Sequence, residues 1–348
     1  MPPEPAGEDL EPGEVPGLTR PRAQAALIGQ EAAERAFREA IGAGRLHHAW
    51  LLGGPRGIGK ATLAYRVARH LLAQQGTGRG VPETLAVAPG HPVARQVAML
   101  SHPNLVVLRR QRAPGAKTVP TQITVEAARR ALHLFAETSA DAGYRICIVD
   151  CAEELNLASA NALLKLIEEP PPRSLFLIVS HAPGRLLPTI RSRCRRLALR
   201  PLGDAEVVRV LQGLGEPFAA HPPEVLARAA RLSEGSVARA LGLLDPATLA
   251  LVDEIEALLA APDWRRVLAL AERLNSRDAD ALYETALDTV QRHLAAEIGR
   301  RLTEPPARLA ALADASERIA RAAREAATYN LDRRPVILSL FEEVAAAR

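Results

Sequence analysis

Aromatic residues and cysteines are scarce in this chain of 348 residues. Only 3% of the residues are Phe, Trp or Tyr, whereas 48% are hydrophobic, so Ala, Leu, Val and Ile must build most of the core. That mixture suits packed helices. The three cysteines, Cys147, Cys151 and Cys194, form no CxxC pair, which argues against a disulfide framework and against a cysteine zinc site. We therefore expect a helix-rich protein that resides in a reducing cytoplasm.

Long apolar runs and a strong charge bias are also missing. No apolar run approaches the roughly 18 residues that a bilayer requires, and Glu and Pro stand where a signal peptide would be basic and then apolar. The net charge of +4 is too small to indicate nucleic-acid binding by itself. The sequence thus predicts a cytoplasmic protein without a membrane partner.

Changes in composition divide the chain into four parts. Residues 1–20 are rich in Pro, Glu and Gly, and we expect them to form a disordered tail. Residues 21–200 alternate between strand and helix patterns. After Pro201 only amphipathic helical patterns follow, which predict a small helical domain over residues 201–245 and a larger one over residues 246–348.

The α/β region contains four short apolar runs, each followed by a helical pattern. Such alternation is typical of a parallel sheet that is covered by helices. A helix is also expected from residue 25 to about residue 42. The expected strands are residues 49–52, 105–108, 146–149 and 175–179, and the expected helices between them include residues 125–135 and 156–167.

A glycine-rich loop follows the first expected strand. The sequence GPRGIGK at residues 54–60 matches the first seven positions of G-x-x-x-x-G-K followed by Ser or Thr. In that motif the glycines let backbone N–H groups surround phosphates, and the lysine reaches their outer oxygens. Because a strand precedes the loop and a helix follows it, we predict a phosphate-binding loop that contains Gly54, Gly57, Gly59 and Lys60.

The metal-binding position of this motif is altered. Ala61 stands where a Ser or Thr hydroxyl would bind Mg²⁺, and Thr62 points about 100° away around an ideal helix. Asp150 ends the expected strand 146–149, where a carboxylate would hold the metal or its water; a turn-capping Asp is the alternative. The residue after Asp150 is Cys151, and a thiol with an ordinary pKa of about 8.5 is a poor base at neutral pH. ATP or ADP binding is therefore expected with doubtful hydrolysis and weak Mg²⁺ binding at most.

Several further segments resemble one family. They are LHHAW at residues 46–50, ANALLK at 160–165 with EEPP at 168–171, and LPTI at 187–190 with SRC at 192–194. In this order they resemble the bacterial clamp-loader subunits of the AAA+ class over about residues 25–245. The resemblance implies a P-loop domain with a parallel sheet, a small helical lid domain and a C-terminal helical collar domain. It also implies motor subunits of the gamma/tau type and delta-type subunits as partners, with the sliding clamp and primer-template DNA reached through the complex.

The resemblance gives roles to three more positions. Arg193 matches the arginine that clamp-loader subunits insert into the ATP site of a neighbouring subunit; the alternative is a solvated basic run with Arg191 and Arg195. Ser180 matches a polar sensor of the γ-phosphate, although it also suits a turn cap. Ala238 stands where motor subunits carry an arginine, which is a third departure from a hydrolytic site.

The expected function is that of a non-motor subunit of the clamp loader. An active motor ATPase that uses Lys60, Asp150 and a displaced Glu153 is the alternative. Direct DNA binding by the basic cluster Arg109, Arg110, Arg112 and Lys117 is a third possibility, but without interleaved aromatic residues a solvated loop is favoured.

Many relatives carry a four-cysteine zinc module after the phosphate-loop helix. Residues 74–103 hold no cysteine here, and His91 and His102 are too few for a tetrahedral site. We therefore expect no zinc.

Overall fold

The computed structural model describes residues 18–74, 81–111, 120–136, 143–276, 279–302, 306–329 and 331–346. It consists of two compact units, Met1–Leu241 and Gly242–Arg348. Residues 1–17, most of the expected tail, lie outside the described residues. The domain borders expected at residues 200 and 245 stay predictions, because the two units divide the chain only once.

A five-stranded parallel sheet forms the centre of the first unit, in the order β2-β3-β4-β1-β5. Leu51 of β1 and Val149 of β3 both lie opposite Ile178 of β4, which fixes the register of the central strands. The predicted fold class, an α/β domain with a parallel sheet followed by all-α regions, is confirmed. The strands are β1 Ala49–Gly53, β2 Leu105–Leu108, β3 Arg145–Val149, β4 Ser174–Ser180 and β5 Arg195–Ala198.

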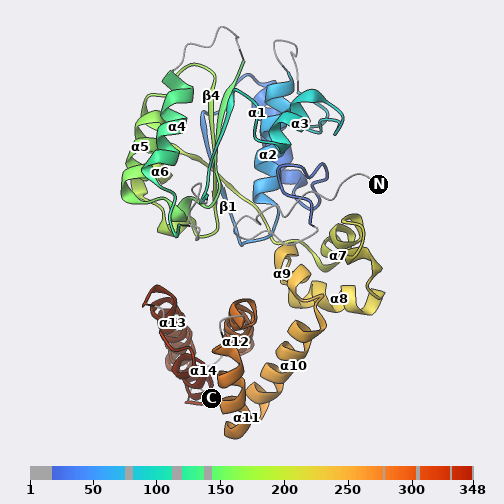
Figure 1. Cartoon of the computed structure of the whole chain (residues 1–348), viewed down its shortest axis with the longest axis vertical. Coiled ribbons are helices and arrows are strands. Elements are labelled where there is room, and N and C mark those ends of the chain that lie inside the picture. The colour runs from blue at the N-terminus through green and yellow to red at the C-terminus, as the bar shows by residue number, and fades with distance from the viewer. Residues whose placement is uncertain are drawn as a thin grey trace. The chain divides into compact units, whose positions relative to one another are not determined.

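Helices cover both faces of this sheet. Helices α1 to α3 lie on one face and α4 to α6 on the other (Figure 1). On the face covered by α4, Phe135 stacks on Phe176 with 4.8 Å between ring centroids, and on the face covered by α1, Phe37 meets Trp50 at 4.2 Å. Because both faces are buried, strands β1 to β4 are mostly apolar. The helices are α1 Glu31–Gly42, α2 Lys60–Ala73, α3 Pro92–Ala98, α4 Val125–Ala136, α5 Leu157–Glu168 and α6 Pro188–Arg193.

The edge strand β5 was not expected from the sequence. Its first two residues, Arg195 and Arg196, are exposed and basic, so it lacks the apolar signature of the other four strands. The guanidinium of Arg195 lies 4.6 Å from the ring centroid of Trp50, in a cation–π contact. Charged side chains are common on edge strands, since they discourage pairing with other chains.

Helix α1 begins at Glu31, six residues later than predicted. Gly29 has a φ of 77°, which interrupts a helix before that point. The side-chain amide of Gln30 donates hydrogen bonds to the carbonyl oxygens of Ile58, at 3.0 Å, and Arg200, at 2.8 Å. The segment before Glu31 therefore runs along the glycine-rich loop instead of joining the helix.

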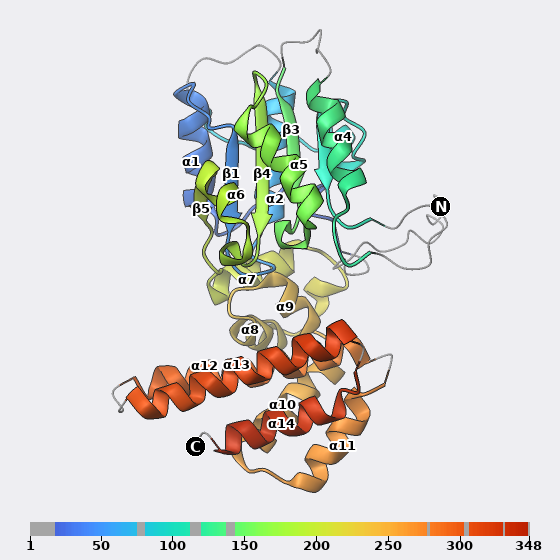
Figure 2. The same ribbon diagram turned by 90° about the vertical axis from the view of Figure 1, so that its left-hand side faces the viewer.

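The rest of the described chain is helical. The first unit continues with α7 Asp204–Gly213, α8 Pro223–Leu232 and α9 Val237–Gly242. In the second unit, Leu270, Leu294 and Leu340 are at most 1% exposed and lie in one core, and α12 packs along α13 (Figure 2). No helix in the described ranges is long and apolar enough to cross a membrane. The second unit contains α10 Pro246–Ala260, α11 Trp264–Leu274, α12 Asp280–Arg300, α13 Pro306–Tyr329 and α14 Arg334–Ala346.

Candidate functional site

The glycine-rich loop connects the carboxyl end of β1 to the amino end of α2. Gly54, Gly57 and Gly59 have φ values of 146°, 79° and 95°, in the region that favours glycine. A side chain on Gly57 would collide with Ser236 and Ala238. The backbone N–H of Val237 donates to the carbonyl oxygen of Gly57 at 2.9 Å, so the start of α9 closes against the loop. The backbone conformation and the close contact with α9 therefore account for glycine at these positions, without reference to a bound ligand.

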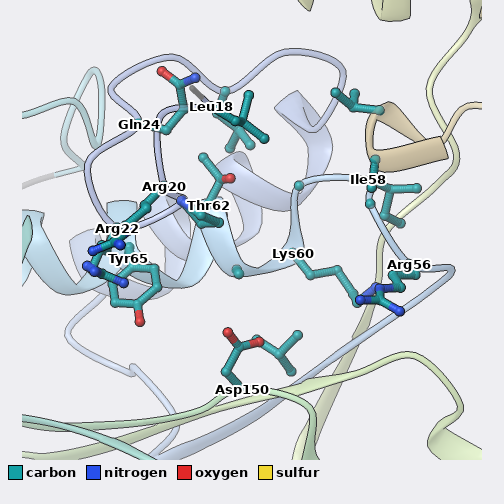
Figure 3. Close-up of a pocket in the computed structure, with 18 of the residues that line it drawn as sticks. Leu18, Arg20, Arg22, Gln24, Arg56, Ile58, Lys60, Thr62, Tyr65 and Asp150 are labelled. Carbon is teal, nitrogen blue, oxygen red and sulfur yellow. The ribbon is translucent and has the colours of Figure 1, made fainter. Parts of the chain in front are cut away.

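Lys60 begins helix α2 and bends back over the loop. Its ammonium donates to the carbonyl oxygen of Gly54 at 2.7 Å and also to that of Pro55. The side chain is buried, and burial lowers its pKa to about 8, although Glu153 and Asp150 act in the opposite direction. Arg56 lies beside it and lowers this pKa further (Figure 3). Two cations therefore converge where a phosphate loop needs positive charge.

A cavity of about 370 Å³ adjoins the loop. Arg56, Lys60, Arg109 and Asp150 contribute charged groups to its lining. Apolar side chains come from the segment before α1 and from residues 202–241, namely Leu27, Ile28, Leu202, Val210, Leu214 and Leu241. A cavity that combines charged and apolar groups beside a phosphate loop suits a mononucleotide, whose phosphates would meet the loop and whose base would contact apolar side chains.

Two arginines of α2 hold the wall formed by residues 18–28. Arg69 donates to the carbonyl oxygens of Arg22, at 2.8 Å, and Gln24, at 2.6 Å. Arg66 donates to the carbonyl oxygen of Ala25 at 2.6 Å. These bonds attach the segment to the same helix that begins at Lys60. The sequence alone gave no sign of this wall.

The position that follows Lys60 carries no hydroxyl, because it is Ala61. Ala61 and Thr62 both line the cavity, and the Thr62 hydroxyl points away from Asp150 (Figure 3). Burial raises the pKa of Asp150, against the influence of Arg109 and Lys60. No group of three His, Cys, Asp or Glu side chains suited to a metal occurs among the described residues. The departure from the Mg²⁺ site of a hydrolytic phosphate loop therefore lies at Ala61, where the hydroxyl ligand is missing.

Arg109 lies beside Asp150 because β2 and β3 are neighbours. The backbone N–H of Asp150 donates to the carbonyl oxygen of Leu108 at 2.9 Å, so the residues after both strands meet at one edge. The next residue, Arg110, forms an ion pair with Glu154 at 2.7 Å. Half of the basic cluster considered for DNA binding thus lines the cavity. Arg112 and Lys117 lie outside the described residues.

Glu153 is engaged by groups of the protein itself. Its carboxylate accepts a hydrogen bond from the Ser180 hydroxyl at 2.6 Å and another from the Ala182 backbone N–H. Burial favours the neutral acid, but these hydrogen bonds outweigh it and lower the pKa of Glu153. Neither Glu153 nor Ser180 lines the cavity. The carboxylate therefore joins the η1 turn Ala152–Glu154 to the end of β4.

Cys151 occupies the position where a hydrolytic relative has its base. The residue has a φ of 63°, and its thiol lies 3.7 Å from a Glu153 carboxylate oxygen. Burial and the nearby carboxylates raise the pKa of this thiol. Cys151 is thus neutral at physiological pH and supplies no base for water.

Helix α9 supplies no cation to the cavity at the expected position. Ala238 lines the cavity, and the following Arg239 forms an ion pair with Glu234 at 2.9 Å. Arg239 itself does not line the cavity. Arg239 therefore does not replace the arginine that motor subunits carry at the position of Ala238.

Arg193 lies in a different cleft. This second cleft is lined by His47, His48, Glu168, Glu169, Ser192 and Arg193, among others, and shares no residue with the first. His47 and His48 precede β1 and Arg193 precedes β5, so the cleft lies at the amino ends of these strands. The glycine-rich loop and Asp150 follow the carboxyl ends of their strands. The two sites therefore occupy opposite ends of one parallel sheet.

Comparisons with known proteins identify the family. The model of the family described as "DNA polymerase III, delta subunit" matches residues 29–203. The DNA polymerase III subunit delta' of Escherichia coli (strain K12) is 32% identical over 260 residues, which cover 72% of each chain. The chain belongs to the DNA polymerase III delta-prime family of clamp-loader subunits.

Two other relatives of this delta-prime-family chain are matched over smaller shares of their own length. The subunit delta' of Pseudomonas aeruginosa is 37% identical over 190 residues, 54% of this chain and 53% of that protein. The subunit tau of Escherichia coli (strain K12) is 30% identical over 264 residues, 73% of this chain and 38% of that protein. The chain thus spans about two fifths to half of the length of these two relatives.

The first cavity of the delta-prime-family chain brings together most of the residues predicted to bind a nucleotide. Gly54 stays outside its lining but accepts the hydrogen bond from Lys60, and Ser180 contacts Glu153 instead. Sequence reasoning missed Arg56 and His181, and it assigned Arg109 to a different role. The predicted residues that line the cavity are Gly57, Gly59, Lys60, Ala61, Thr62 and Asp150.

Proposed function

We propose that this chain is a non-motor subunit of the DNA polymerase III clamp loader that donates Arg193 to the ATP site of a neighbouring subunit. In this role it supports ATP-dependent loading of the sliding clamp onto primed DNA. Its partners are motor subunits of the gamma/tau type and delta-type subunits, and it reaches the clamp and the DNA through the complex. The helices of the second unit form the collar that joins these subunits.

The position of Arg193 carries this proposal. Strand β1 has five residues, so its first and last residues are about 13 Å apart at a rise of roughly 3.3 Å per residue. Arg193 lies at the amino end of the sheet and the phosphate loop at the carboxyl end. An arginine side chain cannot span that distance, and Arg193 is 41% exposed. Its guanidinium is therefore available to a neighbouring subunit but not to the loop of its own chain.

The first cavity holds ATP or ADP without hydrolysing it. Arg56, Lys60 and Arg109 supply positive charge for the phosphates, and the apolar side chains of the lining accept the base. The chain offers no hydroxyl for Mg²⁺ at Ala61 and no base at Cys151.

An active motor ATPase is the competing proposal. It would need Glu153 to activate water, because Cys151 cannot. The Glu153 carboxylate is instead committed to Ser180 and Ala182, and it does not line the cavity. We therefore favour a static nucleotide site.

Turnover by the isolated chain separates the two proposals. The purified chain, freed of other ATPases, is expected to release no phosphate from ATP above the rate of the Lys60→Ala variant. Adding the chain to gamma/tau-type and delta-type subunits is expected to restore clamp loading. Turnover at ordinary ATPase rates that Lys60→Ala abolishes would contradict a static site.

Nucleotide affinity should depend on the protonation of Lys60. Burial lowers the pKa of this ammonium to about 8 in the free chain, so it is charged below pH 8 and neutral above. Since phosphate binding requires the charged form, affinity should fall as the pH rises from 8 to 9.5, by up to about tenfold per pH unit. Fluorescence titration with a labelled ADP would measure this slope.

The Lys60→Arg variant is the control for this pH dependence. A guanidinium stays charged throughout this range, so the variant should bind with a nearly flat pH profile. A flat profile in the unmodified chain would show that Lys60 is charged at all these pH values.

A further inference from the structure

The guanidinium of Arg193 is held by three acceptors of its own chain. It forms an ion pair with Glu168 at 2.9 Å, through Nη2. Through Nη1 it donates to the carbonyl oxygen of Thr189 at 3.1 Å and to the Ser192 hydroxyl at 3.3 Å. A guanidinium has five N–H donors, so these contacts leave donors for a phosphate.

The acceptors differ in how firmly the fold supports them. Thr189 and Ser192 belong to α6, the same short helix as Arg193, and therefore move with it. Glu168 comes from the end of α5, where the preceding Ile167 is only 1% exposed. The Ile167 carbonyl oxygen lies 3.1 Å from Nε2 of His48. The Glu168 carboxylate is therefore attached to the end of α5, next to a buried residue whose backbone is held by His48, and not to α6.

Such support matters for an arginine that must reach another chain. A free arginine side chain has about 2 kcal/mol of rotamer entropy to lose when it is immobilised. An acceptor on a rigid element reduces that loss, because it limits the guanidinium to one orientation before the neighbour arrives. Both partners of the ion pair are about 40% exposed, so the pair is accessible at the surface where a neighbour would bind.

We propose that Glu168 is a positioning residue for Arg193. Its carboxylate presents the guanidinium in the orientation that the ATP site of the neighbouring subunit requires, and it touches neither the nucleotide nor the neighbour's reacting groups. This inference rests on the proposed trans role of Arg193. It adds that the arginine alone is not sufficient for the full rate.

The Glu168→Gln variant in the reconstituted complex tests this role. Gln keeps the size of the side chain but removes the charge that holds Arg193. The kcat of ATP hydrolysis at the adjoining site should fall about fivefold, the equivalent of ~1 kcal/mol for an exposed ion pair, with KM unchanged. Glu169→Gln, in the same cleft, is the matched control and should leave kcat unchanged.

A double-mutant cycle separates positioning from a general structural effect. In an Arg193→Ala background, Glu168→Gln should produce no further loss of kcat, because Glu168 acts only through Arg193. An equal fivefold loss in that background would overturn the inference. The inference would also be overturned if Arg193→Ala lowered kcat and Glu168→Gln did not. That result would still support the proposed role of Arg193 in the neighbouring site. If Arg193→Ala itself were harmless, the proposed function and this inference would both fail.

Discussion

Replacing Arg193 by Ala is expected to lower ATP hydrolysis at the adjoining subunit by about 10³- to 10⁵-fold, the range found for arginines that act in trans on phosphoryl transfer. The side chain lies at the amino end of the sheet, in a cleft that is separate from the chain's own phosphate loop. Its charge would stabilise the negative charge that develops on the neighbour's γ-phosphate. Single-turnover hydrolysis in a complex with one active ATP site, the one beside this chain, would measure the effect.

The neighbouring Arg196 provides a matched control. It is exposed on β5 and does not line the cleft that contains Arg193. Arg196→Ala should therefore leave hydrolysis unchanged, while Arg193→Lys should restore only part of the rate, because an ammonium lacks the planar fork of donors. Equal losses in the two alanine variants would mean that a diffuse basic surface is involved and not one arginine.

Nucleotide binding by the isolated chain is expected to be nearly independent of Mg²⁺. Ala61 provides no hydroxyl, and Arg56, Lys60 and Arg109 already place positive charge in the lining of the cavity. The Kd for ADP should change less than about threefold when EDTA replaces Mg²⁺. Lys60→Ala should weaken binding by about 10- to 100-fold, as expected for a charge-assisted hydrogen bond worth roughly 1.5–3 kcal/mol. Isothermal titration calorimetry would give both values.

The Ala61→Thr variant is the gain-of-function control for this prediction. It returns a hydroxyl to the position where phosphate loops bind the metal, next to Lys60 and on the cavity wall. Binding by this variant should become stronger in Mg²⁺ than in EDTA. If the unmodified chain already lost most of its affinity in EDTA, another group would have to bind the metal.

Much of the fold followed from the sequence because its strands are buried on both faces. The run at residues 105–108 coincides with β2, and the other three expected strands are each one or two residues longer in the structure. The edge strand β5 was missed, since a half-exposed strand that begins with two arginines has no apolar signature. The late start of α1 was also missed, because it depends on hydrogen bonds from Gln30 to residues far away in sequence.

The candidate site was only partly predictable, because much of it depends on which strands are neighbours. The glycine spacing indicated the loop directly. Arg109 was assigned to a basic surface cluster, since only the pairing of β2 with β3 brings it to Asp150, 41 positions later in sequence. The hydrogen bond between Ser180 and Glu153 likewise joins the ends of two adjacent strands. Residue spacing cannot reveal such contacts between strand ends. The role predicted for Arg193 came from the family resemblance and not from spacing.

The most direct test is steady-state ATP turnover by the complete complex, with this chain carrying either Lys60→Ala or Arg193→Ala. If the chain completes a neighbour's site and only holds its own nucleotide, Lys60→Ala should retain nearly full turnover. Arg193→Ala should remove the share that comes from the adjoining site. A complex that Lys60→Ala inactivates and Arg193→Ala leaves intact would show instead that this chain hydrolyses ATP itself.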